Sequence, residues 1–207
     1  VFDSLIKDNA SRYTNYLILH GNLNNISQTL DALPADKVII LDQVADEING
    51  KYPAVYQSFE EDIYECLQSG ITLLKKYKRF VLVYPGGKEP MGFVVGFKRF
   101  CDDYGLANEI VMNIKLVNVQ EGDLYILPND EDLVRIVKDC YSKQLALGKD
   151  VGIISINDMS LKEIVAGGIS TISTDFNVMG KTLAKMVLEN RRDMVKNPSR
   201  LIVRQSL

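Results

Sequence analysis

Polar and aromatic side chains follow several stretches of this chain that have the pattern of buried strands. The candidate residues at such positions are His20, Asp42, Gln57, Tyr84, Lys88, Glu89, Asn157, Asp158, Asp175 and Phe176. In open α/β sheets, small molecules bind beyond the carboxyl ends of the strands. Carboxylates accept hydrogen bonds and amides both donate and accept them, so this set suits a ligand rich in hydroxyl groups.

Four of these residues also have a purely structural interpretation. Asp175 stands where a strand changes into a helix and is a good N-cap, so it either caps the helix or accepts bonds from a ligand. Asn157 and Asp158 either contact a ligand or turn the chain and cap the following helix. His20, the only histidine, either contacts a ligand or satisfies neighbouring backbone groups.

Catalytic and metal-binding patterns are not found. Gly86-Gly87-Lys88 is followed by Glu89 where a phosphate-binding loop needs Ser or Thr. A Ser-His-Asp or Cys-His site would need His20, and no cysteine lies near it in the sequence for zinc. Carboxylates such as Asp130-Glu131-Asp132 are adjacent in sequence, which is more typical of a solvated surface than of a catalytic acid/base pair. We therefore expect no catalysis, no cofactor and no metal.

Alternating strands and helices must position the candidate residues. Strands are expected at 14–19, 37–41, 54–56, 79–84, 110–118, 150–156 and 169–173, and helices at 1–13, 26–33, 58–77 and 91–104, from 130, from 159 and after 175. Residues 121–123 are expected to form an acidic loop, and 189–200 a solvated helix end and loop. This alternation predicts parallel sheets flanked by helices.

Composition narrows the class of protein. The 207 residues carry 24 basic and 27 acidic side chains, a balance of −3 that disfavours nucleic-acid binding by this chain itself. No apolar run approaches the roughly 20 residues needed to span a membrane. Three widely spaced cysteines indicate free thiols, as expected in a reducing cytoplasm.

Two groups of short motifs resemble the sugar-sensing domain of LacI/GalR-type repressors. The first comprises Ser170-Thr171-Ile172, Asp175-Phe176, Met179-Gly180, Ala184 and the stretch L-I-V-R-Q-S at 201–206. The second is Gly92-Phe93 with Gly96-Phe97. The same kind of domain also occurs behind GntR-type winged-helix DNA-binding domains, especially in Bacteroidetes, and we favour that combination.

The resemblance implies a two-lobed fold of the type I periplasmic-binding-protein kind. The first lobe would hold residues 1–56 and 168–197, and the second 57–167 and 198–207. A strand, helix and strand that open the resembled domain have no counterpart here, so the first lobe is expected to be incomplete. Departures are also present: Glu89 stands at the usual arginine position, Gln57 lies where V-x-x-D-N is common, and a G-[FY]-D-D strand is missing.

The function implied is that of a cytoplasmic regulator that senses a small sugar between its lobes. Polar groups would bind sugar hydroxyls, while Tyr84 or Phe176 packs on the sugar ring. DNA would be bound only through an upstream domain, and the intact protein would be a homodimer without membrane contact. The alternatives are a periplasmic solute-binding protein of a sugar transporter and a flavodoxin-like α/β enzyme.

Overall fold

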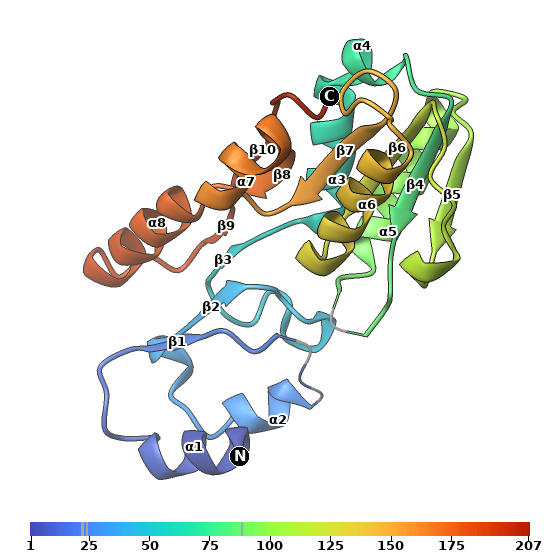
Figure 1. The fold of residues 1–207 in the computed structure, drawn as a ribbon. Coiled ribbons are helices and arrows are strands. Elements are labelled where there is room, and N and C mark those ends of the chain that lie inside the picture. Colours follow the sequence, from blue (N-terminus) through green and yellow to red (C-terminus); the bar gives the residue numbers. More distant parts are fainter. Residues whose placement is uncertain (22, 24, 88) are drawn as a thin grey trace. The chain divides into compact units, whose positions relative to one another are not determined.

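Strands and helices alternate in two separate units of the chain. The computed structural model describes residues 1–21, 23, 25–87 and 89–207 (Figure 1). The smaller unit comprises Val1–Gln57 and Asp175–Pro198, and the larger unit comprises Ser58–Thr174 and Ser199–Leu207. Within the described part of the chain, no helix is both long and apolar enough to cross a membrane.

A four-stranded parallel sheet forms the centre of the smaller unit. Its strands lie in the order β1 (Tyr16–Ile18), β2 (Val38–Asp42), β3 (Ala54–Tyr56) and β9 (Met194–Lys196). Successive strand residues point to opposite faces, so Ile39 packs against Met179 and Met186 of α8 (Phe176–Leu188). Ile40 packs on the other face, in a cluster with residues of α1 (Phe2–Asn9) and α2 (Ile26–Leu30). Short 3-10 turns at Ala35–Lys37 and Asp46–Ile48 complete this unit.

A six-stranded sheet forms the centre of the larger unit. The order is β10 (Ser199–Ile202), β8 (Ser170–Thr174), β7 (Gly152–Ile156), β6 (Asp123–Leu127), β4 (Arg79–Val83) and β5 (Asn108–Val111). All neighbours are parallel except β10, which runs antiparallel to β8. The parallel α/β class expected from the sequence is therefore confirmed.

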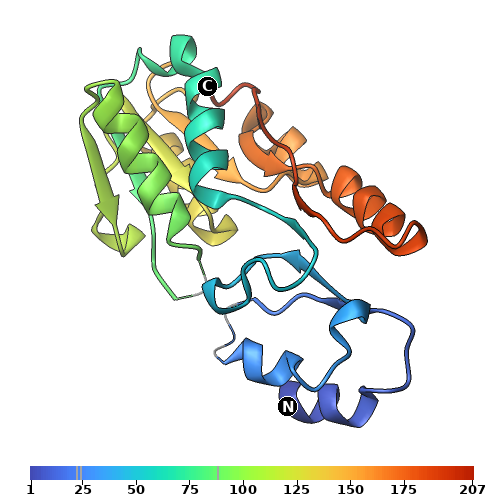
Figure 2. The same cartoon turned by 180° about the vertical axis from the view of Figure 1, so that it is seen from behind.

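Helices cover both faces of the larger sheet, because successive residues of its strands point to opposite faces and both sets are apolar. Phe80 and Leu82 face one apolar cluster, with α3 (Phe59–Ser69) and α5 (Gly92–Asp103), which lie side by side in Figure 2. Val81 and Val83 face the opposite cluster, with α6 (Asp130–Ser142). The remaining short helices are α4 (Ile71–Leu74), α7 (Ser160–Ile164) and the 3-10 turns Ile114–Leu116 and Val165–Gly167.

Glycine permits the close packing of α3 against α5. A Cβ on Gly96 would lie 2.2 Å from the carbonyl oxygen of Glu60 and 2.4 Å from Cγ2 of Ile63. A Cβ on Gly92 would lie 2.9 Å from the backbone nitrogen of Glu60. The two glycines of the second motif are therefore required where the helices touch.

Several expected boundaries are wrong. The strand at 170–174 lies in the larger unit's sheet, so the segment 168–174 does not belong to the first lobe. The acidic loop expected at 121–123 ends in β6, and the polar run 189–200 contains β9. The helix expected over 58–77 is divided at Gly70 into α3 and α4.

Asp123 explains the error at β6. Its carboxylate accepts hydrogen bonds from Nε and Nη2 of Arg79 at 2.8 and 2.7 Å, and from the hydroxyl of Tyr125. These partners allow a charged residue to be 3% exposed at the start of a central strand. The sequence around 121–123 gives no sign of the pairing, because Arg79 lies 44 positions away.

Candidate ligand-binding site

A cavity of about 350 Å³ lies in the larger unit where β6 and β7 end. This volume is at the lower end of the range of roughly 300–1,000 Å³ found for small-molecule pockets. The lining residues are Glu89, Pro128, Asn129, Asp130, Glu131, Ile156, Asn157, Asp158, Met159 and Lys162. Three residues predicted from the sequence, Glu89, Asn157 and Asp158, are thus brought together at one edge of one sheet.

Asn157 is a lining residue whose side chain is available to a ligand. It follows β7, is exposed, and adopts a left-handed backbone conformation with φ 61°, which asparagine tolerates better than most residues. Its backbone nitrogen donates to the carbonyl oxygen of Ile172 at 2.8 Å. No hydrogen bond joins its side-chain amide to another described residue, so the amide can donate and accept toward the cavity.

Lys162 fixes the backbone of the turn at Asn157. Its ammonium group donates to the carbonyl oxygens of Ile156 and Asn157 at 2.9 and 2.8 Å and pairs with Asp130 at 2.8 Å. The side chain is 4% exposed. Three acceptors compensate the cost of burying this charge, and the lysine fixes the backbone on both sides of the bond between residues 156 and 157.

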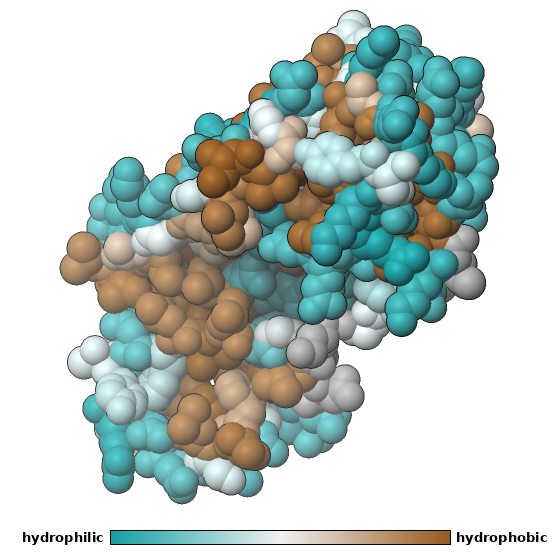
Figure 3. All heavy atoms as spheres, in the orientation of Figure 1, coloured by the Kyte–Doolittle hydropathy of each residue, from teal (hydrophilic) through white to brown (hydrophobic). Residues whose placement is uncertain are grey.

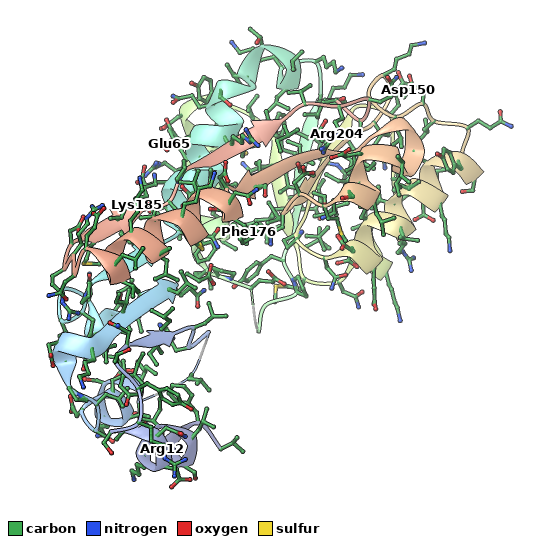
Figure 4. The ribbon with its side chains drawn as sticks, turned by 90° about the vertical axis from the view of Figure 1, so that its left-hand side faces the viewer. Arg12, Glu65, Asp150, Phe176, Lys185 and Arg204 are labelled. Atoms are coloured by element: carbon green, nitrogen blue, oxygen red, sulfur yellow. The ribbon has the colours of Figure 1, made fainter. Side chains whose placement is uncertain are left out.

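Asp158 is engaged by Arg204, which lies just after β10 and is labelled in Figure 4. Nη1 and Nη2 donate to the two carboxylate oxygens at 2.7 and 2.9 Å, and Thr171 donates to Oδ1 at 3.0 Å. The guanidinium group lowers the pKa of Asp158 below its ordinary value, because it stabilises the ionised form. This bidentate pair gives Asp158 a structural role at the cavity wall.

Ser206, two residues later, fastens the same segment to the sheet. Its hydroxyl donates to the carbonyl oxygen of Ile153 and accepts from the backbone nitrogen of Ser170, both at 2.7 Å. Ser206 is 0% exposed. The R-x-S motif at 204–206 is therefore an anchor for the chain after β10.

Glu89 approaches the cavity from the loop after β4. Tyr84 supports this loop, since its hydroxyl donates to the carbonyl oxygen of Glu89 at 2.8 Å. Burial raises the pKa of Glu89, because a partly desolvated carboxylate is harder to ionise. Tyr84 is 6% exposed and packs in the core, so its expected stacking on a sugar is not supported. Lys88 lies outside the described residues.

Three further predicted residues gather at the carboxyl edge of the smaller unit's sheet. Gln57 donates from its side chain to the carboxylate of Asp42, and its backbone nitrogen donates to the Asp42 carbonyl oxygen at 2.9 Å. Nε2 of His20 lies 2.9 Å from the carbonyl oxygen of Gln43 and carries the proton, because a carbonyl can only accept. Nδ1 of His20 is buried without a partner among the described residues.

Asp175 and Phe176 begin α8 in the smaller unit. The Asp175 carboxylate accepts from the backbone nitrogen of Val178 at 3.0 Å, so the capping interpretation is correct. Phe176 is 51% exposed. A ligand contact by Phe176 stays a prediction.

Asn129, Asp130 and Lys162 also line the cavity, although their place there was not predicted from the sequence. Asn129 caps α6, accepting from the backbone nitrogen of Glu131 at 2.7 Å. Asp130 and Lys162 meet only in the folded chain. The fact that Asn129 follows a buried strand, as Asn157 does, is the one sequence signal that would have indicated its place. Among the described residues, no group of three or more His, Cys, Asp or Glu could hold a metal ion.

Comparison with known proteins gives one sequence match and many structural ones. Residues 75–207 match the family model of the periplasmic binding protein-like domain. No curated protein gives a significant match to the sequence.

The fold is similar to several solved structures of bacterial regulators. One is the Escherichia coli transcriptional repressor ascG, at TM-score 0.74 and 14% identity over 95% of this chain and 79% of that one. Another is a probable maltose operon repressor from Staphylococcus, at TM-score 0.76 and 17% identity over 99% and 80% of the two chains. A third is an Arthrobacter LacI-family regulator in complex with lactose, at TM-score 0.74 and 13% identity over 99% and 83%.

Proposed function

The chain belongs to the periplasmic binding protein-like domain family, and we propose that it is the ligand-sensing part of a transcriptional regulator. The ligand is a small sugar or sugar derivative that binds at the cavity where β6 and β7 end. Binding involves no chemical change in the ligand.

The observation that carries this proposal is the free amide of Asn157 beside a mostly polar cavity. Lys162 and the bond to Ile172 hold the backbone of the turn, so the amide is presented with little conformational freedom left to lose. Each hydroxyl of a sugar both donates and accepts, and an amide matches both roles. The lactose bound to the Arthrobacter regulator supports the same class of ligand.

We propose that the ligand acts by binding two conformational states of the protein with different affinity, since only a difference in affinity can shift a population. DNA is then contacted by a domain outside this chain, of the winged-helix GntR type, in a homodimeric cytoplasmic regulator. The net charge of −3 supports this division of labour, because phosphate contacts need clustered basic residues.

Isothermal titration calorimetry against mono- and disaccharides, both neutral and amino-substituted, tests the proposal. We expect selective binding of one sugar and a loss of about tenfold or more in affinity for Asn157→Ala. Asn190→Ala is the matched control, because Asn190 is also exposed, also left-handed at φ 51°, and does not line the cavity. A well-folded protein that binds none of the sugars, or equal affinities for Asn157→Ala and the parent, would refute the proposal.

A further inference from the structure

The described lining of the cavity is unequally charged. It carries the carboxylates Glu89, Asp130, Glu131 and Asp158 and a single ammonium group, on Lys162. Charge of one sign around a concave site attracts ligands of the opposite sign and repels those of the same sign. The cavity's own ion pairs decide how much of this charge a ligand would meet.

The cations at the cavity are already engaged. Lys162 is buried with three acceptors, one of them Asp130. Arg204, behind the wall, is bound to Asp158 through both Nη atoms. A phosphate or carboxylate on a ligand could pair with either cation only by breaking one of these arrangements, which would leave a carboxylate without its partner.

The same pairs neutralise two of the carboxylates, and Glu89 and Glu131 remain. Glu131 lies in the first turn of α6, where the helix dipole favours a negative charge, and is exposed to solvent. Glu89 is half-buried, and no ion pair joins it to a described residue. A cationic ligand group should therefore bind most favourably at Glu89, because this carboxylate is already partly desolvated and loses little further solvation on binding.

We propose that Glu89 makes this cavity selective for a ligand that carries an ammonium group, an amino sugar being the simplest, and that phosphorylated or acidic sugars are rejected. The proposal rests on the proposed function and specifies its ligand class. An ammonium group would form charge-assisted hydrogen bonds with Glu89, which are shorter and stronger than neutral ones. The hydroxyls of the same sugar would remain for Asn157.

Isothermal titration calorimetry on the intact protein tests the proposal with sets of sugars that share one ring stereochemistry and differ in a single substituent. The sets are glucose, glucosamine, N-acetylglucosamine and glucose 6-phosphate, with the corresponding galactose and mannose series. We expect one amine to bind at least tenfold more tightly than its neutral and N-acetyl counterparts, with no binding of the phosphate. The phosphate arm also tests any contribution from Lys88.

Two variants assign the effect to Glu89. Glu89→Gln keeps the shape and removes the charge, so the affinity for the amine should fall about tenfold while that for the neutral sugar changes less than threefold. Glu121→Gln is the control, since it removes an equal charge before β6, at the opposite edge of the same sheet. It should leave both affinities unchanged.

The outcomes separate this inference from the proposed function. Neutral sugars that bind as tightly as their amines, binding of a phosphate, or equal losses for amine and neutral sugar in Glu89→Gln would overturn the inference and leave sugar sensing intact. Failure of every neutral sugar and every amine would overturn both.

Discussion

Replacing Arg204 by alanine should destabilise the larger unit by about 3 kcal/mol. The side chain makes two bonds to Asp158, at 2.7 and 2.9 Å, and one to the carbonyl oxygen of Ile169, at 2.9 Å. Hydrogen bonds to charged groups contribute roughly 1.5–3 kcal/mol each. Three such bonds would sum to at least about 4.5 kcal/mol, but the two side chains of the pair are 16% and 22% exposed, so water replaces part of the loss and about 3 kcal/mol remains.

Urea unfolding followed by circular dichroism, with hydrogen exchange of β7 and β8 to identify the larger unit's transition, measures the change. At roughly 2–4 °C per kcal/mol for a chain of this size, the midpoint of thermal unfolding should fall by about 6–12 °C. Arg204→Lys should recover only part of the loss, because an ammonium group cannot form the bidentate fork.

A double-mutant cycle tests the reasoning behind this number. Asp158→Asn should cost much less in the Arg204→Ala background than in the parent, with a coupling of about 2 kcal/mol. If the two costs add within about 0.5 kcal/mol, the pair does not stabilise the fold as argued.

The pair also predicts how stability depends on pH. The folded pKa of Asp158 is lowered, so its contribution is present above the unfolded pKa of about 3.9 and is lost as pH falls through the folded value. The difference in unfolding free energy between the parent and Arg204→Ala should therefore narrow below about pH 4. A constant difference from pH 7 to pH 3 would contradict this assignment.

Four further changes can be followed by the same unfolding assay. Gly96→Ala should cost about 1–3 kcal/mol or more, since the new Cβ would lie 2.2 Å from a carbonyl oxygen of α3. Gly180→Ala, in the exposed part of α8 with no atom within 4 Å of its Cβ, should instead stabilise by about 0.5–1 kcal/mol, and equal signs would refute the comparison. Ser206→Ala should cost about 2 kcal/mol, because a buried donor and acceptor lose their partner; an unchanged midpoint would exclude the anchoring role. Lys162→Met should cost about 2–4 kcal/mol by freeing two carbonyl groups and should weaken sugar binding beyond its effect on stability, whereas unaltered binding would mean that the turn at Asn157 does not need the lysine.

Much of the fold can be predicted from the sequence where the signal is local. The apolar run at 79–84 and the helix over 91–104 are found within one or two residues. Prediction fails where a distant partner decides the structure. Asp123 begins a central strand because Arg79 compensates its charge, and β9 forms within a polar run because β3 offers a free edge.

The candidate site shows the same limit. Asn157 is predictable, since it ends a strongly apolar strand. Lys162 resembles an ordinary surface lysine in the sequence, and only the fold brings Asp130 and two carbonyl oxygens to its ammonium group. Arg204 pairs with both Asp158 and Glu163. The sequence does not indicate these pairs, because Arg204 belongs to the R-x-S motif and Glu163 to the short helix α7.

Two apolar residues of α7 are exposed on the surface of the larger unit. Leu161 and Ile164 on α7 are 60% and 73% exposed, and Figure 3 shows hydrophobic side chains gathered on the surface over this helix. Their neighbour Lys162 points inward. The bonds of Lys162 to two carbonyl oxygens and to Asp130 attach α7 to the sheet despite its exposed apolar residues.

The anchoring of residues 199–206 to β7 and β8 has a consequence for biosynthesis. These residues emerge from the ribosome after the whole of 175–198, which belongs to the other unit. Until then, the edge of β8 that β10 covers carries unpaired backbone groups, and such edges recruit other chains. A chain that ends between residues 175 and 198 would therefore expose this edge and should self-associate, whereas one that continues through Arg204 and Ser206 should not.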